Sequence, residues 1–222
     1  MRCGVGTTMS KIVVHHLGIS QSDRIVWLCE ELGIDYELRT YQRDSRTRLA
    51  PAEYRALTPF GTAPVISDGD LVLGESGAII EYLIEIHGDG RLKVAPGESG
   101  YADYLFWFHF ANGSLMPAAM IDMVAGLLAN GNEGAVGALR ERLDRAYEQI
   151  EDRLSVVDYL AGDTFTAADI ISAFPLTTMR LFAPRDLTPY PNIRSYLSRI
   201  GERPAFRRAM VKADPGFEVP LS

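Results

Sequence analysis

Strand-like patterning occupies only the first part of this 222-residue chain. Up to about residue 88, β-branched runs alternate with segments of helical spacing, in the order β-α-β-α-β-β-α. The stretch "GDGRLKVAPGESG" that follows is rich in glycine, and beyond it the spacing is helical throughout. We therefore expect an α/β domain over residues 9–88, a linker over 89–98 and an all-α domain over 99–222.

Turn and cap residues divide the α/β domain into its elements. Asp68-Gly69 between two apolar runs is a hairpin signal, and Gly33 is placed to end the first helix. Strands are expected over 11–17 and 35–41 and in the two arms of the hairpin; helices are expected over 20–33, 51–57 and 76–88.

The charge balance limits the partners of this chain. The formal net charge is -7, with no long run of Lys or Arg, so we expect neither a nucleic-acid nor a membrane partner. No apolar run approaches the roughly 18–20 residues that a membrane helix needs. Residues 1–9 lack the apolar centre of a signal peptide and are interpreted as a disordered leader. A cytoplasmic location is expected.

The cysteines and adjacent histidines do not form a recognisable metal motif. Cys3 and Cys29 belong to no C-x-x-C, which excludes a dithiol centre and a thiolate zinc site. His15 and His16 point to opposite faces if their segment is a strand, and no third ligand is suggested. We expect no metal cofactor, and we expect Cys29 to be a core thiol.

Pro64 is unusual because it stands in "GTAPVI", inside a strand-like run. Proline has no N–H to give a sheet ladder. A cis Ala63–Pro64 bond would offer the backbone of Ala63 to a ligand, and an extended peptide could pair with it as an added strand. The alternative is a trans proline that opens the strand, which is the commoner form of an X–Pro bond.

Glu75-Ser76 precedes an expected helix. Ser76 is a natural N-cap, and the free N–H groups at a helix start can hold a carboxylate. Glu75 could meet an ammonium group, so the pair could recognise the α-amino-acid end of a ligand. The alternative is a capped helix with a solvated glutamate.

Ser20 and Ser22 lie between the first strand and the first helix. A hydroxyl at this point could donate a hydrogen bond to a ligand thiolate and lower the pKa of the thiol, as a helix N-terminus also does. Ser20-x-x-Asp23 is also a capping-box pattern, so Ser20 could simply cap the helix. A second capping box, Thr166 with Asp169 in "DTFTAADI", is expected to be structural.

Taken together, these motifs resemble those of the cytosolic glutathione S-transferases. The succession "GISQSDRIVWLCEELGIDYEL", "TPFGTAPVI" and "ESGAIIEYL" resembles their thioredoxin-like domain, and "DTFTAADI" and "YPNIRSYLSRIGERPAF" resemble their all-α half. The resemblance covers nearly the whole chain from about Met9. It is greatest for the bacterial and fungal group that has a serine near the start of the first helix.

The resemblance implies a role for each motif. Pro64 corresponds to the family's cis-proline, Ala63 to the residue whose backbone pairs with the cysteinyl part of glutathione, and Ser20 to the activating hydroxyl. Glu75 and Ser76 correspond to the pair that holds the γ-glutamyl end. The helices that face the cleft would form the second-substrate pocket, with Tyr104, Trp107, Phe108, Asn112 and Met116 as its candidate residues.

The sequence departs from the family pattern at two places. The family often has valine before the proline, where this chain has Ala63, a change that a backbone role tolerates. "SQSDR" lacks the S-S-C stretch of the zeta-type isomerases and the cysteine of the omega-type enzymes, which makes those activities less favoured.

The expected function is conjugation of glutathione, as co-substrate, to an electrophilic and mostly apolar small molecule by a homodimeric enzyme. A non-catalytic interaction module with the same fold is an alternative. A glutathione-dependent peroxidase or reductase is another, although the lack of a cysteine at the helix start disfavours disulfide exchange.

Overall fold

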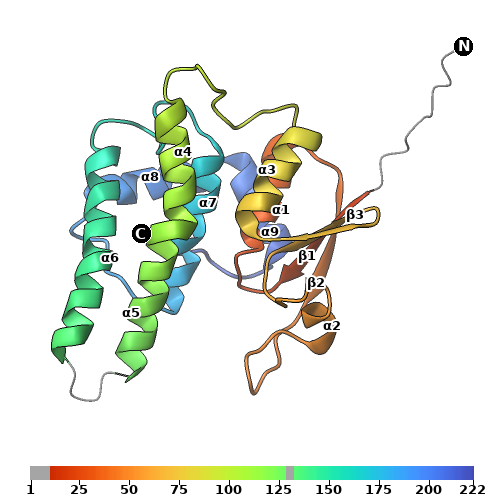
Figure 1. The fold of residues 1–222 in the computed structure, drawn as a ribbon, viewed down its shortest axis with the longest axis horizontal. Helices are drawn as coiled ribbons and strands as arrows, with labels where there is room; N and C mark the ends of the chain where they lie inside the picture. The colour runs from red at the N-terminus through yellow and green to blue at the C-terminus, as the bar shows by residue number, and fades with distance from the viewer. Residues whose placement is uncertain (1–10, 129–132) are drawn as a thin grey trace, which may run out of the picture.

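Four strands in the described part of the chain form one mixed sheet, on the right of Figure 1. The computed structural model describes residues 11–128 and 133–222, and the expected leader lies outside the described residues. The order across the sheet is β2-β1-β3-β4, with β1 parallel to β2 and β3 antiparallel to both neighbours. The strands are β1 (Ile12–Leu17), β2 (Tyr36–Tyr41), β3 (Val65–Asp68) and β4 (Leu71–Gly74).

The predicted hairpin is confirmed, with its loop one residue later than the sequence signal. Asp68 pairs with Leu71, which leaves Gly69 and Asp70 as the two loop residues. Gly69 has φ 58°, a backbone conformation that glycine adopts without steric cost. This tight return places β4 at the edge of the sheet and brings the chain directly to the next helix.

Three helices belong to the α/β half: α1 (Asp23–Leu32), α2 (Ala52–Arg55) and α3 (Ser76–Ile86). The helices α1 and α3 lie between the sheet and the helical half, whereas α2 lies on the other side of the sheet (Figure 1). Tyr54 of α2 packs with Leu17 and Val65 in a small separate core. Gly33, with φ 66°, ends α1 as predicted.

The remaining described chain is helical, which confirms the expected α/β plus all-α architecture. Its elements are α4 (Tyr101–Phe110), a π-helical turn (Ala111–Leu115), α5 (Met116–Leu128), α6 (Glu133–Leu154), α7 (Ala167–Leu176), a 3₁₀ turn (Thr178–Leu181), α8 (Pro191–Glu202) and α9 (Pro204–Ala213). Within these residues no helix is long and apolar enough to cross a membrane.

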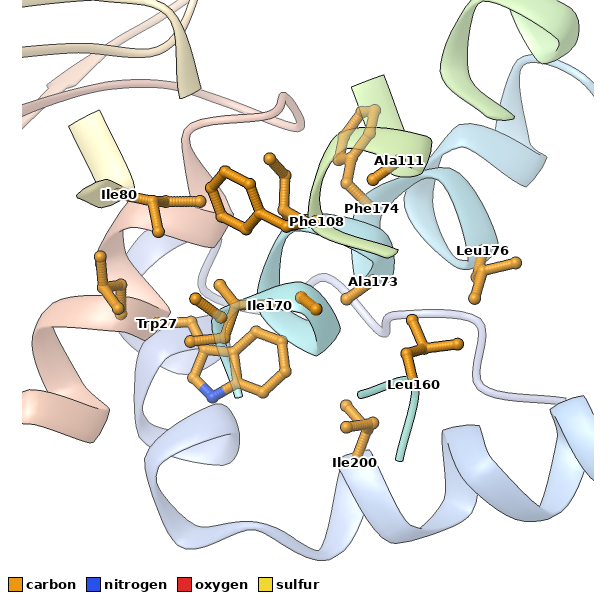
Figure 2. Packing of buried hydrophobic residues seen from close by; sticks show 14 of the residues in the cluster. Trp27, Ile80, Phe108, Ala111, Leu160, Ile170, Ala173, Phe174, Leu176 and Ile200 are labelled. Carbon is orange, nitrogen blue, oxygen red and sulfur yellow. The ribbon is translucent and has the colours of Figure 1, made fainter. Parts of the chain in front are cut away.

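Helix α7 lies at the centre of a core that both halves share. Figure 2 shows Ile170, Ala173 and Phe174 of α7 facing residues of α1, α3 and α4. Trp27 of α1, which is 1% exposed, packs against Phe165 just before α7, and also against α9. The glycine-rich segment therefore separates the two halves in sequence but not in packing.

The predicted capping box fixes the start of α7. The Thr166 side chain accepts from the Ala168 N–H at 3.3 Å, and the Thr166 N–H donates to Asp169 Oδ2 at 2.8 Å. Asp169 also accepts from the Leu160 N–H and from the Tyr196 hydroxyl. This carboxylate has no exposed surface and serves the fold.

Candidate active site

A cavity of about 470 Å³ opens between the loops of the α/β half and the ends of α5 and α7. Ser20 and Ala63 both line it, although they are far apart in the sequence. Its polar side also holds Gln21, Thr62 and three arginines, Arg43, Arg48 and Arg55. Its apolar side is formed by Leu17, Ile19, Leu49, Ala50, Met116, Met120, Met123, Phe174, Met179 and Phe182.

Ser20 and Ser22 are not equivalent in the structure. Ser20 is 5% exposed and lines the cavity, whereas Ser22 has no exposed surface. The Ser20 hydroxyl lies 2.8 Å from Ser22 Oγ and 2.6 Å from the Leu17 carbonyl oxygen. Of the two hydroxyls, that of Ser20 is the one beside the cavity.

The Ser20 hydroxyl oxygen accepts from the Ser22 N–H at 3.3 Å, but Ser20 is not the N-cap of α1. Helix α1 begins at Asp23 rather than at Ser20, its N-cap is Ser22, and no side chain caps it. Both serine side chains are drawn back to the end of β1 instead, where Leu17 supplies the partners: its carbonyl accepts from Ser20, and its N–H donates to Ser22 Oγ at 3.2 Å. The first turn of α1 therefore keeps N–H groups without a side-chain cap.

The Ala63–Pro64 peptide bond is cis, as predicted. Pairing of β3 with its neighbours begins at Val65, so Ala63 stands just before the ladder and at the cavity wall. Pro64 itself is buried. This is the position from which a backbone N–H and C=O can meet an extended ligand.

Glu75 and Ser76 hold a different geometry from the expected cap. The first helical residue of α3 is Ser76, and the residue before it, Glu75, has φ 67° and ψ 115°, a rare backbone conformation for a residue with a side chain. Glu75 is exposed, while Ser76 is 3% exposed. Strained residues of this kind concentrate at ligand sites, which supports a binding role for this corner.

A buried polar bridge ties Ser76 to both halves of the molecule. Asn112 Nδ2 donates to Ser76 Oγ at 2.9 Å, and Arg24 Nη1 donates to Asn112 Oδ1 at 3.2 Å. The same Arg24 nitrogen donates to the Ile171 carbonyl of α7 at 2.6 Å. Asn112 stands in the π-helical turn, a type of distortion that is frequent at functional sites. Because Ser76 Oγ accepts here, its proton remains to be donated elsewhere.

The five residues predicted for a second-substrate pocket do not lie together. Met116 lines the Ser20 cavity. Phe108 and Asn112 line a separate hollow of about 330 Å³ beside Glu75. Tyr104 and Trp107 are 7% and 4% exposed and belong to the hydrophobic core.

Most of the cavity wall was not predicted from the sequence. Met116, Met120 and Met123 follow a helical i, i+4, i+7 spacing on α5, a signal that was available in the sequence. The three arginines have no such pattern, because they come from the irregular segment after β2 and from the end of α2. They collect positive charge at one cavity in a chain whose net charge is -7.

Burial perturbs two charged groups at the start of α1. Asp23 and Arg24 are 6% and 1% exposed. Desolvation raises the pKa of Asp23 to about 7, against the opposing effect of neighbouring Arg24, and desolvation lowers the pKa of Arg24 to about 10. In residues 11–128 and 133–222, no three His, Cys, Asp or Glu side chains gather as a metal site.

Both halves of the chain match family models. Residues 20–86 match the glutathione S-transferase N-terminal domain, and residues 98–204 match the glutathione S-transferase C-terminal domain. Glutathione S-transferase 3 of Schizosaccharomyces pombe is 34% identical over 91% of this chain and 88% of its own length. Glutathione S-transferase 1 of Saccharomyces cerevisiae is 26% identical over 91% of this chain and 95% of its own.

Solved structures agree with these relatives. A glutathione S-transferase from Actinobacillus pleuropneumoniae superimposes with a TM-score of 0.84 at 33% identity, covering 92% of this chain and 94% of that one. The similarity therefore extends over both halves of the chain.

Proposed function

Because the chain belongs to the cytosolic glutathione S-transferase superfamily, we propose that glutathione lies in the cavity beside Ser20 and that this hydroxyl holds its sulfur as a thiolate. The protein is a glutathione transferase, which joins the glutathione sulfur to an electrophilic small molecule. The chemistry needs a nucleophilic thiolate at neutral pH, and a hydroxyl donor beside the uncapped first turn of α1 favours the ionised sulfur.

Groups at the cavity, and at the corner before α3 that lies outside its lining, support an extended, peptide-like pose. The backbone of Ala63 precedes the β3 ladder and pairs with the cysteinyl unit, as an added strand does. At the corner before α3, Ser76 donates to the γ-glutamyl carboxylate and Glu75 meets its ammonium group. The polarised bridge through Asn112 supports this assignment, because it leaves the Ser76 proton available.

The arginines define the opposite end of the ligand. Arg43, Arg48 and Arg55 line the same cavity as Ser20, so they meet the free carboxylate of the glycyl unit. Arg43 is held in place by the Gly18 carbonyl at 3.3 Å and by the Arg48 carbonyl at 3.2 Å. A peptide with charged groups at both ends is thus fixed at both ends, with its sulfur between them.

The second substrate is apolar because the rest of the cavity is apolar. Met116, Met120 and Met123 on α5 face the same space as Phe174 and Met179. Methionine side chains adapt to varied shapes, so we expect a pocket that accepts several electrophiles of moderate size. Orientation beside the thiolate then supplies the rate, without a covalent enzyme intermediate.

We propose a homodimer that acts in the cytoplasm, the state and location typical of the family, and exposed apolar side chains support the dimer. Phe60 is 81% exposed, and Phe106 and Leu105 on α4 are 47% and 37% exposed. Leu105 and Phe106 line one open hollow with Phe110, and contiguous exposed apolar surface of this kind is typical of an interface that a second copy covers. Sedimentation of Phe60→Ser should show more monomer than wild type; an unchanged, fully dimeric profile would remove Phe60 from the interface.

The position of Ser20 in the cavity carries the proposal, and Ser20→Ala tests it. Conjugation of a chromogenic aryl halide should fall about a hundredfold, as it does when one preorganised donor is lost from an active site. Glutathione affinity measured by titration calorimetry should change little, because the two ends of the ligand remain held. Ser155→Ala, at an exposed serine, is the matched control.

Two results would contradict this assignment. Turnover of Ser20→Ala within twofold of wild type would remove Ser20 from the reaction. Absence of glutathione binding by the wild type at millimolar concentration would favour an interaction module.

A further inference from the structure

Behind Ser20, four side chains form a continuous line through the molecule. Ser20 Oγ lies 2.8 Å from Ser22 Oγ, and Ser22 Oγ lies 2.9 Å from Nδ1 of His16. Nε2 of His16 lies 3.2 Å from Oδ2 of Asp214, as an ion-pair contact rather than an aligned hydrogen bond. The line runs from the cavity to Ser22 just before α1, then to His16 near the end of β1, and ends at Asp214 just after α9.

Burial sets this line apart from ordinary surface hydrogen bonding. His16 and Ser22 have no exposed surface, and the Asp214 side chain is 15% exposed. Buried polar groups destabilise a fold unless they have partners, so each member of the line depends on the next. Asp214 is itself held in place, because its Oδ1 accepts from the Ile19 N–H at 3.0 Å.

A second cavity lies at the other end of the line. It has a volume of about 440 Å³, and His16, Asp214 and Lys212 line it. Ile19, Arg43 and Arg48 line both this cavity and the one beside Ser20. The four side chains therefore connect two cavities, and the second is large and polar enough to admit water.

The hydrogen-bonding capacity of each group permits a directed chain. A neutral His16 with its proton on Nε2 keeps that proton on the side of Asp214, without an aligned hydrogen bond to it, and leaves Nδ1 to accept from Ser22. Ser22 Oγ can then accept from the Ser20 hydroxyl, for which the Leu17 carbonyl is the competing acceptor. With its own proton directed inward, Ser20 Oγ is an acceptor for a group in the cavity.

We propose that His16 accepts the proton of the glutathione thiol through Ser22 and Ser20, an inference that rests on the function proposed above. The S–H bond breaks as its proton passes to Ser20 Oγ. The Ser20 proton passes to Ser22 Oγ, and the Ser22 proton passes to His16 Nδ1. The result is a thiolate and an imidazolium, and the new Ser20 O–H now donates to the sulfur.

Charged side chains on several elements lie around His16. Asp214 faces His16 from the end of α9, and the negative charge of Asp23 acts on it from α1. Arg24 opposes these negative charges beside Asp23, and Arg43, Arg48 and Lys212 oppose them from the second cavity. The contact at 3.2 Å makes Asp214 the dominant partner. After the thiolate has reacted, the proton leaves to water through the second cavity.

The number of protons released when the full-length protein binds glutathione tests the proposal. Calorimetric titration with glutathione at about pH 8, above the usual histidine range, in buffers of different ionisation enthalpy gives the protons released. Ultraviolet difference absorbance gives the thiolate formed. The ratio of protons released to thiolate formed should be close to zero in wild type, because His16 keeps the proton. In His16→Asn the amide still reaches Ser22 but takes no proton, so the ratio should approach one, and kcat/KM should fall about a hundredfold.

Two controls separate this role from a structural one. His15→Asn changes the neighbouring histidine, which is 2% exposed and bonds to Tyr41 and Ser67 on the other face of β1. It should keep the wild-type ratio and activity. Asp23→Asn tests the other buried acid near the line and should also keep the wild-type ratio.

Each result of these titrations either supports or contradicts the proposed proton path. A wild-type ratio near one overturns the proposal even if the variants fail to fold, and so does a ratio near zero in His16→Asn. Ser22→Ala, which interrupts the line at a different residue, should give the same rise in the ratio. If wild type binds no glutathione, the proposed function fails and the proton path fails with it. If wild type forms thiolate with full proton release, only the path fails.

Discussion

The two helices that meet behind the cavity, α1 and α7, begin in opposite ways. At α7, Thr166 caps the helix and the buried Asp169 accepts from the Leu160 and Thr166 N–H groups and from Tyr196. At α1 no side chain caps the helix, Ser22 is turned toward His16, and one oxygen of the buried Asp23 has no hydrogen-bond partner.

The difference separates a helix start that serves stability from one to which we assign a role in the proposed chemistry. Burial raises the pKa of both aspartates, to about 6 for Asp169 and about 7 for Asp23. Hydrogen bonds from three residues moderate the effect at Asp169, whereas Asp23 depends mainly on Arg24. Under the proposed function, the Ser20 hydroxyl beside the start of α1 serves the ligand, whereas the Thr166 side chain serves the cap of its own helix.

Asp169→Ala should have the largest effect on stability. It leaves several buried donors without an acceptor, so we expect a loss of about 4–5 kcal/mol in the free energy of unfolding. Urea unfolding of the protein without ligand measures this loss. Asp169→Asn, which keeps part of the acceptor capacity, should lose clearly less; equal losses would contradict the hydrogen-bond explanation.

Asp23→Asn should raise the free energy of unfolding, in contrast to Asp169→Ala, and the size of the gain should depend on pH. The folded pKa of Asp23, about 7, lies above its ordinary value of 3.8, so its contribution to stability is complete below about pH 4 and is lost as pH rises through 7. The variant removes this loss and should be more stable than wild type above pH 7, by up to about 4 kcal/mol, and similar to it near pH 4. Unfolding midpoints measured across this range check it, and a parallel pH dependence in both proteins would refute it.

Thr166→Ala should cost only about 1 kcal/mol, the usual value of a lost N-cap, with conjugation by the folded protein unchanged. Ser20→Ala should show the reverse balance at the other helix: a smaller loss of stability and a large loss of turnover. Measuring both quantities for both variants sharpens the comparison. A loss of kcat in Thr166→Ala as large as in Ser20→Ala would show that the two helix starts do not differ in their roles.

Local patterns in the sequence predicted much of the fold. The hairpin after Asp68 and the Thr166 capping box each depend on neighbouring residues, and both are confirmed; the cis bond before Pro64 was expected from the family resemblance and is also confirmed. The late start of α1 was not predicted, because the capping pattern at Ser20 competes with bonds to the end of β1 that only the folded chain provides.

Contacts between residues far apart in the chain could not be predicted from local sequence patterns. Nothing near Arg24 in the chain indicates that it is buried between Asn112 and the Ile171 carbonyl. The candidate pocket residues on α4 were chosen for their aromatic character, yet Tyr104 and Trp107 fill the core because they lie on the face that packs inward. Partners such as His16 and Asp214 come together only when the last helix docks.

The docking of α9 on α1 has a consequence for synthesis of the chain. The face of Trp27 that packs against Phe206 stays uncovered until residues near the end of the chain have left the ribosome. Folding during translation usually proceeds one domain at a time from the N-terminus. Here the α/β half cannot complete its core early, so a nascent chain paused at the glycine-rich segment would expose apolar surface and attract chaperones until α9 arrives.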